Sequence, residues 1–188
     1  MTRFPIRHGI KYLFIICIAC MGFIMPTQAQ NDGDTLSASK QHNKFYRDIL
    51  PKPLGYVSDY EHLYTVEQKI FLDSLISDFK KDTRIEIAVI TIDTSMTTID
   101  SLDEFAKHIA NAWGVGEPET NNGILVAISS GFRRMRIVNG YGIEKILSDS
   151  ETKEIIDNYF IPKFKTGEYF TGTVDGLGTL MRVLKKKL

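Results

Sequence analysis

The stretch that decides the fold is NNGILVAISSGFRRMRIVNGYGIEKILSD, residues 121–149. Its apolar run at 124–128 is typical of a strand that is buried on both faces. Residues 130–131 supply turn chemistry, and residues 134–139 follow as another strand, so the two segments are expected to form a hairpin. The glycine-rich turn at 140–142 then leads the chain toward a further helix.

The sequence before this stretch predicts two helices and another strand. Thr65 opens a capping box, and the apolar residues after it recur at helical spacing to about residue 81. Residues 85–92 are β-branched and almost continuously apolar, which indicates the first core strand. Ser101 repeats the capping-box pattern, and Gly114 is expected to end the second helix.

Two helices are expected after the hairpin. Ser148 or Asp149 is expected to cap the first, and Pro162 is expected to end or kink it. The second contains Gly176 and Gly178, which weaken a helix by ~1 kcal/mol each relative to alanine unless close packing compensates. The order of elements predicts an α/β protein, a three-layer α/β/α sandwich around a small mixed β-sheet.

The N-terminus has the pattern of a secretory signal peptide, predicted for residues 1–29. Three basic residues precede an apolar run at 12–25, which is shorter than the roughly 20 residues that span a bilayer. Residues 30–54 are then expected to be a flexible linker, and residues 55–188 the folded domain. The chain is therefore expected to be exported, to the periplasm or the extracellular space, with no integral membrane span after signal removal.

The two cysteines, Cys17 and Cys20, both lie in the apolar run and would leave with the signal peptide. Residues 18–20 resemble a lipoprotein cleavage box, so lipid anchoring at Cys20 is the less favoured alternative. Simple cleavage leaves 20 basic and 23 acidic side chains, a net charge of −3. Such a chain lacks the dense basic face of a nucleic-acid-binding protein, so no nucleic-acid partner is expected.

Polar residues gather at one predicted edge of the sheet. Asn121 and Asn122 precede the second core strand, and the returning strand brings Glu144 and Asp149 to that same edge. Carboxylate and amide oxygens are ligands that calcium accepts, and no histidine or cysteine is near, so a divalent-cation site is expected. Turn chemistry and a helix cap explain the same residues equally well, and topology alone does not assign Asp59 to an edge.

Several motifs in fixed order resemble the TPM domain family, named for thylakoid, periplasmic and membrane-linked proteins. They are Gly55-Tyr56-Val57-Ser58-Asp59-Tyr60, Arg84-Ile85-Glu86-Ile87-Ala88-Val89-Ile90-Thr91, Ala112-Trp113-Gly114-Val115-Gly116, Asn121-Asn122-Gly123-Ile124-Leu125, Arg136-Ile137-Val138-Asn139-Gly140-Tyr141-Gly142-Ile143-Glu144, Leu147-Ser148-Asp149, Ile161-Pro162-Lys163-Phe164 and Gly167-Glu168-Tyr169. The resemblance extends from about residue 55 to 184.

The resemblance implies an α/β/α sandwich and a site at the positions of four residues, Asp59, Asn122, Glu144 and Asp149. The family is similar to a plant thylakoid-lumen protein described as an acid phosphatase involved in photosystem repair, and some members bind calcium. Val138 stands where an acidic residue is common, which weakens any transfer of catalysis to this chain.

Three hypotheses for function follow. The first is an exported cell-envelope domain whose acidic edge binds calcium, active in envelope or membrane-protein maintenance, with envelope or membrane proteins as partners. The second is a weak, metal-assisted acid phosphatase, in which the cation polarises a phosphoryl oxygen. The third is a protein-interaction module without catalysis. The predicted metal ligands are Asp59, Asn121, Asn122, Glu144 and Asp149.

Overall fold

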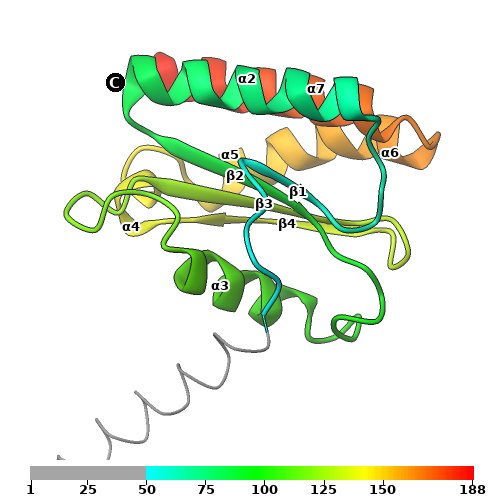
Figure 1. The fold of residues 1–188 in the computed structure, drawn as a ribbon. Coiled ribbons are helices and arrows are strands. Elements are labelled where there is room, and N and C mark those ends of the chain that lie inside the picture. The colour runs from blue at the N-terminus through cyan, green and yellow to red at the C-terminus, as the bar shows by residue number, and fades with distance from the viewer. Residues whose placement is uncertain (1–49) are drawn as a thin grey trace, which may run out of the picture.

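The computed structural model describes residues 50–188. They form a four-stranded mixed sheet with helices on both faces, so the predicted α/β/α sandwich is confirmed (Figure 1). The predicted signal peptide, the cleavage box at Cys20 and residues 30–49 of the predicted linker lie outside the described residues. Within residues 50–188, no helix combines the length and the apolar content that crossing a membrane requires.

The strands follow one another across the sheet in chain order. β1 (Val57–Asp59), β2 (Glu86–Thr91) and β3 (Gly123–Ser129) are parallel, and β4 (Arg134–Asn139) pairs antiparallel with β3. The predicted hairpin is therefore confirmed. β1 was not predicted, because three residues are too few to show a strand periodicity.

The two helices before the hairpin are α2 (Val66–Thr83) and α3 (Leu102–Trp113). Thr65 caps α2 with both hydrogen bonds of a capping box, as predicted. The prediction of a capping box at Ser101 is wrong, because Ser101 has right-handed helical dihedral angles and its side chain makes no capping hydrogen bond. Its hydroxyl oxygen instead accepts a hydrogen bond from Thr98 at 3.1 Å.

The chain after β4 is helical almost throughout. It forms α4 (Tyr141–Glu144), α5 (Asp149–Ile155), the π-helical segment η1 (Ile156–Phe160), α6 (Ile161–Lys165) and α7 (Tyr169–Lys185). Ser148 caps α5 with a complete capping box to Glu151. Pro162 does not end this run, because it lies in the first turn of α6, where its missing N–H is tolerated.

Two apolar clusters fill the spaces between the layers. One lies between the sheet and the layer of α2, α5, η1 and α7, and the other between the sheet and α3 (Figure 1). β2 and β3 serve both clusters, since Ile87 and Val126 point to the first and Ile90 and Leu125 to the second. This two-sided burial explains why both strands are almost continuously apolar in the sequence.

Candidate functional site

A depression of about 700 Å³ runs along β4. It extends to the edge of the sheet at which β3 begins and β4 ends. Its walls are α3 on one face of the sheet and α5 with η1 on the other. The segment before β3 and the short helix α4 line one end. Three of the five predicted ligands, Asn121, Glu144 and Asp149, line this end together.

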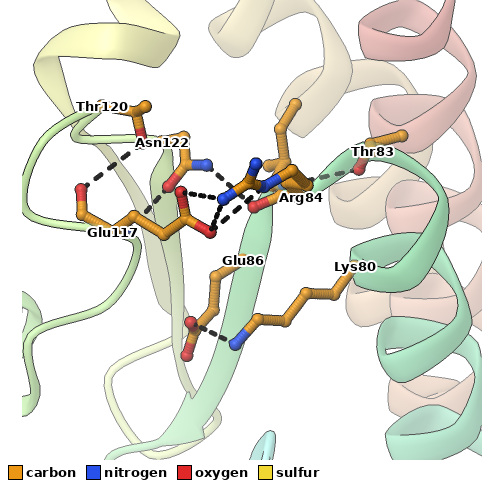
Figure 2. A network of polar contacts seen from close by, with 8 residues as sticks. Lys80, Thr83, Arg84, Glu86, Glu117, Thr120 and Asn122 are labelled. Carbon is orange, nitrogen blue, oxygen red and sulfur yellow. Dashed lines mark hydrogen bonds and ion pairs between the residues drawn. The ribbon is translucent and has the colours of Figure 1, made fainter.

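A polar network holds the segment before β3 in place (Figure 2). Asn122 Oδ1 accepts a hydrogen bond from the Glu117 backbone N–H at 2.8 Å, and Asn122 Nδ2 donates to the Arg84 carbonyl at 2.8 Å. The Arg84 guanidinium in turn pairs with the Glu117 carboxylate at 3.0 Å. Because both Oδ1 and Nδ2 bind protein groups, the Asn122 side chain holds this segment in position. Asn122 does not line the depression.

The Gly-Tyr-Gly turn fits against this segment only because its glycines lack side chains. A Cβ atom on Gly140 would lie 2.3 Å from the Asn121 carbonyl oxygen, and one on Gly142 would lie 2.1 Å from that of Thr120. The Gly142 N–H donates to the Asn121 carbonyl at 3.0 Å. These glycines therefore permit a close backbone approach, and neither has a positive φ angle.

The side chains at this end of the depression have oxygens without protein partners. Within residues 50–188, the carboxylates of Glu144 and Asp149 make no hydrogen bond and no ion pair. Asn121 has a left-handed φ of 48° and uses its Nδ2 to donate to the Pro118 carbonyl at 3.2 Å. Its Oδ1 has no partner in the described part of the chain. All three side chains are exposed.

Asn139 is a fourth candidate, which no sequence motif indicated. Its Nδ2 donates to Thr152 Oγ1 at 2.9 Å, and that hydroxyl donates to the Ser148 carbonyl at 3.0 Å. The hydroxyl proton is thereby committed, which fixes the amide orientation and leaves Asn139 Oδ1 buried without a partner among residues 50–188. Its position directly before Gly140 was the only signal available in the sequence.

Asp59 lies at the opposite edge of the sheet, where β1 and β2 end. This corrects the prediction that Asp59 groups with the other four proposed ligands. Asp59 pairs in register with Thr91 at the ends of β1 and β2, whereas the depression reaches the start of β3. Asp59 Oδ1 accepts from the Thr91 hydroxyl at 2.7 Å and the Leu63 N–H at 3.0 Å, and Oδ2 accepts from the Tyr64 N–H at 2.9 Å. Asp59 therefore fixes the chain between β1 and α2.

Glu61 occupies the same far edge, where open α/β sheets usually bind ligands. Its carboxylate accepts from the Ser130 N–H at 2.9 Å and from the Gly131 N–H at 3.2 Å. The backbone donors of the β3–β4 turn are thus used by a protein carboxylate. This leaves the depression at the other edge as the candidate site.

The donor set of the depression fits a hard divalent cation better than a transition metal. Carboxylate and amide oxygens are typical ligands of calcium, and the residues lining the depression include no histidine and no cysteine. Among residues 50–188, no three Asp, Glu, His or Cys side chains gather into a metal-binding group. A cation would therefore have to bind to two carboxylates together with neutral oxygens.

Comparison with solved structures finds several similar folds, among them those of three proteins. The N-terminal domain of a protein from P. gingivalis is 30% identical, with a TM-score of 0.63, over 71% of this chain and 83% of that one. The BA42 protein from Bizionia argentinensis is 23% identical, with a TM-score of 0.57, over 69% and 86%. The N-terminal domain of the cg2496 protein from Corynebacterium glutamicum is 16% identical, with a TM-score of 0.52, over 70% and 82%.

The two structures under 25% identity support the fold alone. A comparison with curated proteins finds no match. A family model described as the TPM domain matches residues 57–183, which includes all four strands and nearly all of α7. The chain therefore belongs to the TPM domain family.

Proposed function

We propose that the chain is an exported cell-envelope protein whose depression binds a divalent cation, calcium by preference. The observation that carries the proposal is the buried Oδ1 of Asn139, which has no partner among residues 50–188 and belongs to a residue that lines the depression with Glu144 and Asp149. A buried amide oxygen without a hydrogen bond costs about 1–3 kcal/mol, and a cation ligated by it would remove that cost. Asn121 supplies a second amide oxygen.

The small number of charges predicts weak binding. In the described part of the chain, only two carboxylates line this end of the depression, and calcium affinity rises with the number of charged ligands. We expect a Kd on the order of 1 mM, within the range typical of extracellular calcium modules. Such a site suits a compartment rich in calcium, which agrees with the export proposed from residues 1–29.

Calcium titration followed by amide NMR tests the site. Shifts are expected at residues 139–149, and Asn139→Ala and Asp149→Asn should each weaken binding about tenfold. Glu154→Gln is the matched control, because Glu154 is an exposed carboxylate on the same helix outside the depression lining. Equal affinity in all four proteins would refute the site, as would the absence of shifts near Asn139 at millimolar calcium.

N-terminal sequencing tests the proposed export of the protein. Protein recovered from the source cells should begin at Gln30 when sequenced from its N-terminus. A mature protein beginning at a lipid-modified Cys20 would support the anchoring alternative instead, and an N-terminus at Met1 would refute export. Envelope or membrane proteins are the proposed partners, in keeping with a role in envelope maintenance.

Phosphatase activity is the second candidate, because cationic side chains line the depression beyond the proposed cation site. Arg134, Arg136 and Lys107 could hold a phosphoryl group, but the described lining contains no serine, cysteine or histidine as a nucleophile. A water activated by the proposed cation is the nucleophile in this second candidate. Phosphomonoester hydrolysis should fall at least about tenfold in Asp149→Ala, and equal turnover in the two proteins would indicate contamination.

A further inference from the structure

β4 is an edge strand whose outer backbone groups have no partner in the described part of the chain. The Gly140 N–H donates to the Gly123 carbonyl at 2.8 Å, which identifies residues 123 and 140 as a hydrogen-bonded pair. Such pairs alternate along an antiparallel ladder. Met135, Ile137 and Asn139 must therefore direct their N–H and C=O groups away from β3, and within residues 50–188 none of these six groups has a hydrogen bond outside the strand.

The two outermost strands of the sheet differ: the outer side of β1 is protected, and the outer side of β4 is less so. β1 is only three residues long, and the Asp73 carboxylate caps the Val57 N–H at 2.8 Å. β4 has six residues, contains no proline, and pairs with β3 in an unbroken register without a bulge. Natural proteins usually protect such an edge with prolines, bulges or charged side chains, and β4 has only the charges of Arg134 and Arg136. Its backbone is therefore a template for an added strand of complementary charge.

The depression surrounds this edge with helices on both sides. α3 lies along one wall and α5 with η1 along the other, with the outer side of β4 between them. A single extended chain needs less room between such walls than the edge of a folded domain does. The edge of a second folded copy fits less well, because its own β4 would lie between the same two helical walls.

The two sides of β4 differ in chemistry. On the α3 side, Arg134 and Arg136 share one carboxylate, that of Asp103, at 3.9 Å each, so positive charge is in excess there. On the other side, Ile137 is buried in the first apolar cluster, and Met135 and Ile156 are half-buried against it. An added strand complementary to both sides would alternate acidic and apolar residues, because successive side chains point to opposite faces.

We propose that β4 binds an extended segment of a partner polypeptide as a fifth strand. Its acidic side chains lie toward Arg134 and Arg136, and its apolar side chains lie toward Met135 and Ile156. The backbone groups of Met135, Ile137 and Asn139 supply the hydrogen bonds. This interaction does not depend on the cation, which is proposed to bind at one end of the same depression.

Synthetic peptides test the interaction with the full-length chain. The first probe is an eight-residue peptide of alternating glutamate and valine, acetylated and amidated at its ends, and the second has lysine in place of glutamate. The first should bind and protect the amides of Met135, Ile137 and Asn139 from hydrogen exchange about tenfold or more, and the second should bind at least about tenfold more weakly. Equal binding of the two peptides would overturn the proposal.

Backbone methylation of the peptide distinguishes strand addition from simple charge attraction. N-methyl groups on the valines and on the glutamates are tested separately, because alternate amides of an added strand face β4. One methylated peptide should lose binding and the other should retain it. Retention in both would show that no ladder forms.

Variants of β4 complete the test. Met135→Pro removes an outward N–H without breaking the β3–β4 ladder, and should abolish binding, whereas the control Met135→Leu should bind as the wild type does. Arg136→Glu, an exposed substitution, should weaken the glutamate peptide about tenfold and favour the lysine peptide. Protection of the three amides from hydrogen exchange without any peptide would overturn the proposal. Protection that rises with protein concentration would indicate that a second copy occupies β4. Protection that is independent of protein concentration would indicate that residues 1–49 occupy it.

Discussion

Two aspartates of this chain show how surroundings decide the role of a residue. Asp59 accepts three hydrogen bonds from protein donors, and Asp149 accepts none among residues 50–188. The first carboxylate is therefore committed to the fold. The second, at an exposed position in the first turn of α5, is available to a ligand.

Asp59→Ala should destabilise the protein without changing its cation affinity. Removing the carboxylate leaves the N–H groups of Leu63 and Tyr64 without their acceptor, so the free energy of unfolding should fall by about 2–3 kcal/mol. Asp149→Ala is the contrasting variant, expected to lose at most about 1 kcal/mol from the helix dipole while weakening calcium binding. Urea unfolding and calcium titration of both variants measure the two effects, and weakened calcium binding in Asp59→Ala would contradict this assignment.

Glu151 should contribute a pH-dependent stabilisation. The hydrogen bond from Lys187, with those from the Ser148 N–H and hydroxyl, lowers the pKa of Glu151 from 4.5 to about 2. Because the folded pKa lies below the unfolded one, the stabilisation is present above about pH 4.5 and is lost as the pH falls toward 2. Carboxyl NMR titration should show this low pKa.

The control for Glu151 is Lys187→Met, which removes the largest cause of the shift. The pKa of Glu151 should then return toward its usual value, with Ser148 retaining part of the effect. Acid unfolding of Glu151→Gln should lack this contribution between pH 4.5 and 2. An unchanged pKa in Lys187→Met would show that the ion pair with Lys187 does not form in solution.

At the scale of the element, Gly176 and Gly178 of α7 have different structural roles. A Cβ atom on Gly176 would lie 2.2 Å from the ring of Phe160, so this glycine allows α7 to pack closely against η1. A Cβ atom on Gly178 would meet no atom of residues 50–188 within 4 Å. The expected compensation by close packing is thus present at Gly176 and absent at Gly178.

Substituting alanine at the two positions should change stability in opposite directions. Gly176→Ala overpacks against a fully buried ring and should lower the free energy of unfolding by about 1–3 kcal/mol. Gly178→Ala keeps the packing and improves helix propensity, so it should raise the free energy of unfolding by about 0.5–1 kcal/mol. Chemical denaturation of both variants provides the comparison, and a loss in both would show that α7 tolerates neither change.

At the scale of the whole molecule, residues 50–52 before β1 are part of the packed structure. Leu50 is only 7% exposed, and the Pro51 carbonyl accepts a hydrogen bond from Trp113 Nε1 at 2.7 Å. Tyr60 donates its hydroxyl proton to the Lys52 carbonyl. These contacts connect residues 50–52 to α3 and to the segment after β1.

A shortened chain that begins at Gly55 should be less stable than one that begins at Leu50. The difference should be about 2–4 kcal/mol, from the exposure of apolar surface around Leu50 and the loss of the Trp113 hydrogen bond. Trp113 is the only tryptophan, so its fluorescence reports the change directly. Its emission should shift to longer wavelength in the shorter chain, and identical spectra and stabilities would contradict the docking of residues 50–54.

The layers and most element boundaries could be predicted from the sequence, because they depend on local patterns. The apolar runs of β2 and β3 and the capping box at Thr65 are each contained in a few consecutive residues. Ser101 shows the limit of such patterns, since its spacing suited a capping box but its backbone adopted helical angles. The role of Asn122 was equally hidden, because both of its partners lie outside the motif.

The sequence by itself determined the α/β/α class, the hairpin and the presence of Asn121, Glu144 and Asp149 at one edge. The tertiary structure decided that Asp59 lies at the other end of the strands. It also decided that, among residues 50–188, Asn139 Oδ1 has no partner and the outer side of β4 is unpaired. The physical reason is that these features depend on groups far apart in the chain. Asp59 is fixed by Thr91, 32 residues away, and Glu61 by Ser130, 69 residues away.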